Sequence, residues 1–193
     1  MKLIIASNNK HKIKEIKKIL EGCFDEIVSL SEAGIEHETV EDGITFFENA
    51  KKKAYEIAMI SGCAALADDS GICVRALGGA PGVMSARFCG EHGDDEGNND
   101  LLLEKLKGEE DRSAYYACAI VICYPDGRHV ASHGYFFGEI TEERIGSGGF
   151  GYDPLFKPVG SSRTVAEMSE DEKNRISHRA KALRRILDKI ERA

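Results

Sequence analysis

The order of segments at the start of the chain constrains the fold most. Lys2–Ala6 (KLIIA) is a short apolar run typical of a buried strand, and the polar sequence SNNKHK follows it. The next segment has the apolar stripe of a helix, formed by Ile13, Ile16, Ile19 and Leu20. Strand, polar loop and helix in this order open an α/β fold. Glu26–Leu30 is expected to form a second strand.

The middle of the chain continues this alternation. Thr45-x-x-Glu48 is a capping box, which predicts a helix running to about Ser61. Ala64–Ala67 predicts a compact strand that ends at Asp68-Asp69-Ser70-Gly71, where the Ser-Gly pair favours a turn. Arg75–Gly82 is expected to be a loop, and Asn98–Lys107 a short helix.

The last third predicts a hairpin and a terminal helix. Ala114–Tyr124 and His129–Gly138 are expected to be antiparallel strands joined by a Pro-Asp-Gly turn. Ser169-x-x-Glu172 is a second capping box, and apolar residues recur at helical spacing from there to Ile190. No linker or repeat interrupts the chain, so we expect one mixed α/β domain over residues 1–193.

Composition and charge exclude several classes of function. The formal net charge at pH 7 is −7, which repels nucleic acid, so a phosphate site would need local cations or a metal. The six cysteines form no CxxC pair, and no basic stretch leads into an apolar run at the start. No apolar run is long enough to span a bilayer. We therefore expect a soluble cytoplasmic protein that binds neither nucleic acid nor membrane.

The first loop is a candidate anion site. Ser7, Asn9 and Lys12 lie between the first strand and its helix, where backbone N–H groups and a lysine favour anions. The pattern alone favours a plainer interpretation, in which Asn9 caps the helix and Lys12 is solvated.

Adjacent carboxylates are the second candidate. Asp68 and Asp69 follow a strand, where oxygen ligands suit a hard cation, and neighbouring strand residues point to opposite faces. A capped turn with one solvated aspartate is equally compatible. Glu41 has no structural duty visible in the sequence. Lys53 lies at i+4 from Asn49, so the two side chains can reach one ligand, although it is also one of three consecutive lysines.

Two later segments could contact a flat ligand. Gly146-x-Gly148-x-x-Gly151 matches a dinucleotide fingerprint formally, but Tyr152-Asp153-Pro154 follows where a helix should begin, and we expect DPLF to be extended. We expect these glycines instead to bring the backbone close to a ligand beside Phe150 or Tyr152. Lys173, His178 and Arg179 add donors around a helix break, although ordinary surface charge is the favoured interpretation of Arg179 taken alone. P-loop, GxSxG and HExxH motifs do not occur.

Individually these signals are weak, but their order is specific. SNNKHK, EDGITFFENAKKKA, DDSGICVRALGGAPGVMSARF, GSGGFGYDPLF and EKNRISHRAKAL resemble the inosine/xanthosine triphosphate pyrophosphatase family from residue 7 to about residue 183. Differences such as Lys10 and Ile72 lie beside the matching positions.

The resemblance implies an elongated α/β mixed sheet in two lobes with a central nucleotide cleft, usually as a homodimer. It implies Mg²⁺-dependent hydrolysis of ITP, dITP and XTP to the monophosphate and pyrophosphate, which keeps these nucleotides out of DNA and RNA. The implied metal ligands are Glu41 and Asp69, and the implied catalytic residues are Asp69, Asp68 and Lys53. The implied substrate contacts are Ser7, Asn8, Asn9, Lys10, His11, Lys12, Ser70, Phe150, Gly151, Tyr152, Asp153, Lys173, His178 and Arg179.

In the expected mechanism, Asp69 or Asp68 activates the water that attacks the α-phosphorus, and Lys12 and Lys53 stabilise the leaving pyrophosphate. Donors from His178, Arg179 and backbone near Phe150 are expected to favour 6-oxopurines over adenine. Two alternatives stay open. A Maf-like pyrophosphatase would favour pyrimidine or modified nucleotides but lacks the GGFGYDP and SHR blocks, and a nucleotide sensor would bind without turnover.

Overall fold

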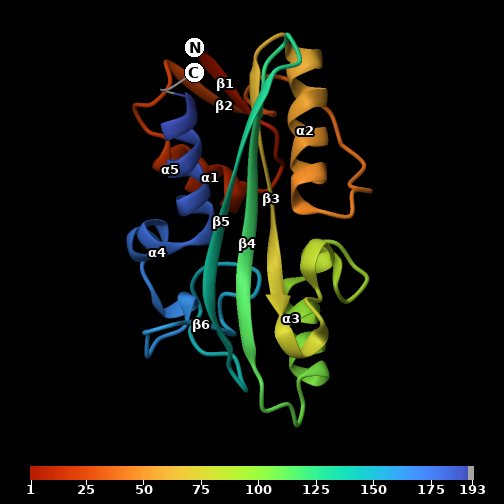
Figure 1. The fold of residues 1–193 in the computed structure, drawn as a ribbon, viewed down its shortest axis with the longest axis vertical. Coiled ribbons are helices and arrows are strands. Elements are labelled where there is room, and N and C mark those ends of the chain that lie inside the picture. Colours follow the sequence, from red (N-terminus) through yellow and green to blue (C-terminus); the bar gives the residue numbers. More distant parts are fainter. Residues whose placement is uncertain (191–193) are drawn as a thin grey trace. The chain divides into compact units, whose positions relative to one another are not determined.

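The computed structural model describes residues 1–190, which form a six-stranded mixed sheet (Figure 1). The strands are β1 (Lys2–Ile5), β2 (Glu26–Ser29), β3 (Ala64–Val74), β4 (Ser113–Cys123), β5 (His129–Ile140) and β6 (Phe156–Pro158). Their order in the sheet is β2-β1-β3-β4-β5-β6. β1 pairs in parallel with β2 and β3, whereas β5 and β6 are antiparallel. The predicted α/β class with a mixed sheet is confirmed.

Five α-helices accompany the sheet within residues 1–190. They are α1 (Lys10–Ile19), α2 (Phe46–Ser61), α3 (Asp95–Lys105), α4 (Glu170–Ile176) and α5 (His178–Ile190), and 3₁₀ helices span Arg75–Leu77, Gly82–Arg87 and Val165–Glu167. The capping boxes predicted at Thr45 and Ser169 are both formed. A third capping box, between Thr164 and Glu167, opens the last 3₁₀ helix and was not predicted. None of the helices in the described part of the chain is long and apolar enough to cross a membrane.

The chain divides into two compact units. Among the described residues, unit 1 contains 1–69, 118–134 and 179–190, and unit 2 contains 70–117 and 135–178. Strands β3, β4 and β5 each contribute residues to both units. Two units agree with the predicted two lobes, while the elongated outline and the central cleft stay predictions.

The core of unit 1 follows from the alternation of side chains along its strands. Leu3 and Ile5 of β1 pack with Leu66 of β3 against α1 and α5. Ile4 of β1 and Ala65 of β3 pack on the opposite face, against α2. Figure 1 shows α1 and α5 on one side of these strands and α2 on the other. Each face of the unit 1 sheet is therefore covered by helices, as expected of parallel strands.

Unit 2 has its own core, which includes aromatic side chains in contact with one another. Leu102 and Leu106, in α3 and just after it, pack with Ile72 of β3. Tyr116 of β4 and Phe156 of β6 belong to the same cluster, with ring centroids 4.8 Å apart in an edge-to-face arrangement.

Three sequence predictions about element boundaries were wrong. β3 does not end before a turn at Asp68 but continues to Val74. A Cβ on Gly71 would collide with the Ser85 hydroxyl, which also accepts a hydrogen bond from the Ile72 N–H at 2.9 Å. This close approach by the second 3₁₀ helix requires glycine in a strand rather than in a turn.

The other two corrections concern a helix start and a loop. α3 begins at Asp95 because the Asp94 carboxylate accepts the Gly97 N–H at 2.9 Å, which caps the helix earlier than predicted. Asp153, Pro154 and Leu155 of the DPLF segment form turns, with the Leu155 N–H bonded to the Tyr152 carbonyl at 3.0 Å, and only Phe156 is extended, as the first residue of β6.

Candidate active site

The first loop caps α1 and orients a buried ion pair. Asn9 Oδ1 accepts hydrogen bonds from the N–H groups of His11 and Lys12 at 3.0 and 3.1 Å, so the predicted cap is confirmed. Ser7 Oγ accepts the Asn9 N–H at 3.2 Å. Lys12 is not a solvated lysine, because its Nζ lies 2.7 Å from Asp68 Oδ1. Asn8 is exposed in the same loop, and Lys10 and His11 are exposed in the first turn of α1.

Asp68 is enclosed by cations on the face of β3 that α1 and α5 cover. Its side chain is fully buried, and Arg179 Nε donates to Oδ2 at 2.9 Å. The Cys118 thiol donates to the same oxygen, also at 2.9 Å. Arg179 pairs in addition with Glu15 of α1, a residue that the sequence analysis missed. The predicted contact between Arg179 and the nucleotide stays a prediction, but this guanidinium is 1% exposed and already engaged by two carboxylates.

Asp69 meets a different set of partners on the face that α2 covers. Asn49 Nδ2 donates to its Oδ2 at 3.1 Å, and Lys53 Nζ lies 3.4 Å from its Oδ1. The same Lys53 ammonium donates to Glu41 Oε1 at 3.0 Å. Asn49 and Lys53 therefore both reach Asp69 from α2, and their joint contact with a ligand stays a prediction.

The pKa values of the two aspartates are shifted in opposite directions. Burial by itself raises the pKa of Asp68, but the charges of Arg179 and Lys12 outweigh it and hold that pKa well below its ordinary value. Burial raises the pKa of Asp69, and the charges of Lys53 and Lys12 do not fully offset this effect. Asp68 is therefore a fixed anion with both oxygens engaged, whereas Asp69 binds a proton more readily.

The oxygens around Lys53 have the chemistry of a magnesium site. The Lys53 ammonium contacts the carboxylates of both Glu41 and Asp69. It also donates a hydrogen bond to the backbone carbonyl of Asp68 at 3.0 Å. Hard oxygen donors of this kind suit Mg²⁺, which commonly takes one or two carboxylates and completes its shell with water and phosphate. No group of three or more His, Cys, Asp or Glu side chains suited to a metal occurs within residues 1–190. Glu41 and Asp69 are the two carboxylates here that could hold such an ion, and magnesium binding at them stays a prediction.

A second cluster lies entirely within unit 2 and is organised by Asp153. Asp153 Oδ2 pairs with Lys173 Nζ at 2.7 Å and accepts the Phe150 N–H at 3.0 Å. Lys173 Nζ also lies over the Phe150 ring, 4.2 Å from its centroid. Gly149 has φ 74°, and a Cβ there would collide with the Asp153 carboxylate. The structure thus brings together Phe150, Asp153 and Lys173, three predicted substrate contacts.

His178 joins this cluster through Tyr116, which the sequence analysis missed. Their rings stack with centroids 4.7 Å apart and planes inclined by 6°. The Tyr116 hydroxyl donates to Asp153 Oδ1 at 3.4 Å. Tyr152, predicted to lie near a flat ligand, is instead 4% exposed and donates its hydroxyl to the Ser85 carbonyl at 2.8 Å. Its contact with a nucleotide stays a prediction.

The glycine between Phe150 and Tyr152 is held by α3. The Gly151 N–H donates to Asp95 Oδ2 at 2.7 Å, and Asn99 Nδ2 donates to the Gly151 carbonyl at 2.9 Å. These two residues lie in a stretch that no motif distinguished. Ser70, the remaining predicted contact, is half-buried in β3.

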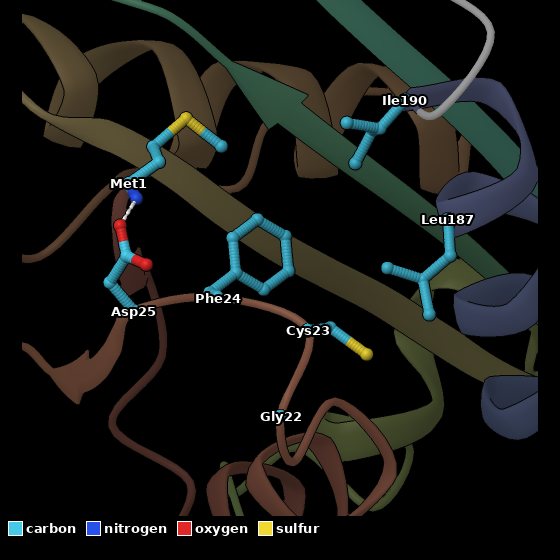
Figure 2. Close-up of a pocket in the computed structure, with 7 residues that line it drawn as sticks. All are labelled: Met1, Gly22, Cys23, Phe24, Asp25, Leu187 and Ile190. Atoms are coloured by element: carbon cyan, nitrogen blue, oxygen red, sulfur yellow. Dashed lines mark hydrogen bonds and ion pairs between the residues drawn. The ribbon is translucent and has the colours of Figure 1, made fainter.

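Unit 1 also has two pockets outside the ion-pair clusters. The first, about 430 Å³, is shown in Figure 2 and is lined by Met1, Gly22, Cys23, Phe24, Asp25, Leu187 and Ile190. The Met1 amino group forms an ion pair with Asp25 at its edge. The second, about 590 Å³, is lined by Asn8, Ser31, Gly34, Ile35, Glu36, His37 and Glu38. Of the predicted substrate contacts, Asn8 alone belongs to either set of lining residues.

Comparison with protein-family models places nearly the whole chain in one group. The Ham1 family model matches residues 3–189. The chain belongs to the Ham1 family. A dITP/XTP pyrophosphatase of Clostridium perfringens is 48% identical, with 98% of this chain and 97% of the relative aligned.

Solved structures support the Ham1 assignment. A HAM1 protein from Coxiella burnetii superimposes with a TM-score of 0.89 at 36% identity, covering 100% of both chains. A nucleoside-triphosphatase, or dITP/XTP pyrophosphatase, from Mycobacterium abscessus gives a TM-score of 0.79 at 42% identity, covering 97% of this chain and 99% of that one. The family resemblance expected from the sequence blocks is confirmed.

Proposed function

We propose that this chain hydrolyses dITP, ITP and XTP to the monophosphate and pyrophosphate. The relatives named dITP/XTP pyrophosphatase align over nearly its full length at 42–50% identity. The observation in the structure that carries the proposal is the pair of adjacent carboxylates, Asp68 and Asp69, whose environments shift their pKa values in opposite directions. Such divergence within a pair of titratable groups is a feature of acid–base sites.

Asp69 is the proposed general base. Its raised pKa and its place beside Lys53 and Asn49 suit a carboxylate that takes a proton from water. The water oxygen would then bond to the α-phosphorus while the α–β bridging oxygen leaves with pyrophosphate. Asp68 is unsuited to this role, because Lys12 and Arg179 hold it as an anion.

Lys12 and Lys53 are the proposed partners of the departing phosphates. Both ammonium groups are mostly buried beside carboxylates, with side-chain exposures of 17% and 12%. Burial strengthens their electrostatic effect on negative charge that develops on the leaving group. We also propose Mg²⁺ as the cofactor, held by Glu41 and Asp69. When bound, it would neutralise charge on the phosphate oxygens.

The unit 2 cluster is the proposed site of base recognition. The Phe150 ring offers a face for a flat purine, and Lys173 and His178 offer donors for a 6-oxo group. Adenine presents a 6-amino donor at that position and would leave those groups unpaired. We further propose a cytoplasmic homodimer. The family resemblance supports the dimer, and six free cysteines, three of them buried, support a reducing compartment.

Pyrophosphate release from a panel of nucleotides tests this function. The panel is ITP, dITP, XTP, GTP, ATP and UTP, each with and without Mg²⁺. We expect ITP, dITP and XTP to be cleaved far faster than ATP, with roughly a thousandfold preference in kcat/KM if two buried groups are left unpaired, and GTP to be poor. Preference for UTP would favour a Maf-like activity, and tight ITP binding without turnover would indicate a sensor.

Metal dependence has its own control. Glu41→Gln should raise the Mg²⁺ concentration needed for half-maximal rate while leaving the rate at saturating Mg²⁺ less affected. The matched control is Glu38→Gln, an exposed-loop carboxylate lining the second pocket. Full activity in the presence of EDTA would overturn the magnesium proposal and leave the hydrolase proposal intact.

A further inference from the structure

Tyr116 is an enclosed side chain that touches two predicted substrate contacts at once. One face of its ring lies flat on His178, with centroids 4.7 Å apart. Its hydroxyl reaches Asp153 Oδ1 at 3.4 Å, and Asp153 in turn holds Lys173 at 2.7 Å. The ring also meets Phe156 edge-to-face at 4.8 Å, which fixes it in the unit 2 core. A single residue therefore links His178 to the Asp153–Lys173 pair.

We propose that Tyr116 is a positioning residue for purine-base recognition, a role that rests on the function proposed above. Its ring sets the plane of the His178 imidazole, and its hydroxyl ties that imidazole to the Asp153–Lys173 pair. His178 and Lys173 are thus presented to the base as one preorganised unit. Neither the resemblance nor any sequence motif assigned a role to this tyrosine.

The physical basis is the rotational freedom of an imidazole. The terminal torsion of histidine is broad, so an unsupported ring samples many orientations. A flat neighbour at stacking distance removes most of that freedom before any ligand arrives, which lowers the entropic cost of binding. Burial and the charge of Asp153 raise the pKa of Tyr116 well above its ordinary value, so its hydroxyl stays a donor.

Tyr115 provides a matched control on the same strand. Consecutive β4 residues point to opposite faces, and Tyr115 packs on the exposed Tyr135 and Phe137 rings at 6.1 and 5.7 Å. Tyr115→Leu removes the same chemical group from the other face of the strand. A merely structural aromatic at Tyr116 would behave like this control, with a loss of stability and no change in substrate preference.

Steady-state kinetics with ITP and ATP make the first test. We expect Tyr116→Leu to raise KM for ITP about tenfold, with kcat changed less than about twofold and the ITP/ATP preference reduced. Tyr116→Phe keeps the ring, so its KM should rise less than about threefold. Tyr115→Leu should leave both parameters within about twofold. If Tyr116→Leu changes ITP and ATP equally, or matches Tyr115→Leu, the positioning role is overturned.

NMR of the unmodified protein makes the second test and does not depend on how well Tyr116→Leu folds. A tyrosine face at 4.7 Å shields the imidazole protons, so the His178 signal should be shifted upfield of the other five histidines. Tyr116→Phe should keep this shift. Adding inosine monophosphate should move the signal, because the proposal places His178 at the base. An unshielded signal, or one that inosine monophosphate does not move, overturns the proposal.

The two proposals fail in different ways. If the unmodified protein releases no pyrophosphate from ITP, the proposed function fails, whatever Tyr116 does. If it cleaves ITP normally while either test above gives the contrary result, the hydrolase remains and the role of Tyr116 is lost.

Discussion

Strand β3 carries two adjacent aspartates whose side chains enter opposite environments. On the face covered by α1 and α5, Asp68 meets two cations and a thiol and loses all exposure to water. On the face covered by α2, Asp69 shares one lysine with Glu41 and takes an amide hydrogen bond from Asn49. The comparison teaches that the partners, and not burial alone, decide in which direction the pKa of each buried carboxylate is shifted.

The largest expected effect is on stability, and it belongs to the Asp68 face. Asp68→Asn should lower the free energy of unfolding by about 3–5 kcal/mol, because it leaves the buried Arg179 guanidinium without its main anion. Urea denaturation at pH 7 measures this change. Asp69→Asn is the matched control and should stay within about 1 kcal/mol of the unmodified protein. Equal losses of unfolding free energy in the two variants would show that Asp68 and Asp69 do not differ in their contribution to stability.

The next effect is on turnover, and it belongs to the Asp69 face. Asp69→Asn should reduce kcat for ITP at least ~100-fold, the low end for removing a general base, while circular dichroism stays unchanged. Near-full turnover of this variant at saturating Mg²⁺ would show that Asp69 is not the base. The two aspartate variants together therefore separate a group that maintains the fold from one that acts on water.

The local features of this site could be predicted from the sequence. The Asn9 cap, the Thr45 capping box and the alternation of Asp68 and Asp69 across β3 depend on neighbouring residues, and all three hold in the structure. The strand boundary at Asp68 was wrong because Asp-Asp-Ser-Gly has the composition of a turn. Buried cations and the close approach of Ser85 make the same residues part of a strand.

The features that the sequence could not show depend on distant partners. Arg179 is 111 residues from Asp68 in the sequence. From the sequence alone, Arg179 is interpreted as surface charge or as a ligand contact, because local pattern cannot show that Asp68 is its buried partner. Tyr116 lies in the predicted strand Ala114–Tyr124, and no motif distinguishes it from its neighbours. Its contacts with His178 and Asp153 arise only when β4 is packed against segments 37 residues and more away. Local pattern identified the ligand-like residues, and tertiary packing decided which residues support them.

The third prediction concerns the lysines of the two faces. Lys12→Ala and Lys53→Ala should each weaken pyrophosphate binding about 10- to 100-fold, since a hydrogen bond to a charged group contributes about 1.5–3 kcal/mol. Binding of inosine monophosphate should change little, because it lacks the departing phosphates. Isothermal titration with both ligands measures the difference. Equal losses for the two ligands would assign these lysines to the scaffold or to the base.

The smallest expected effect is a difference in how the stability of the two aspartate variants depends on pH. It appears only in acid. The folded-state pKa of Asp68 lies well below its ordinary 3.8, so its contribution to stability is present above about pH 4 and is lost as pH falls through the folded value. The pKa of Asp69 is raised, so its effect on stability has the opposite pH dependence. Its stabilising contribution is present below about pH 3.8 and is lost as pH rises. Urea denaturation of the metal-free protein between pH 3 and pH 7 should therefore show a steeper acid loss in Asp69→Asn, which retains Asp68, than in Asp68→Asn. A steeper acid loss in Asp68→Asn would reverse the assignment of the two faces.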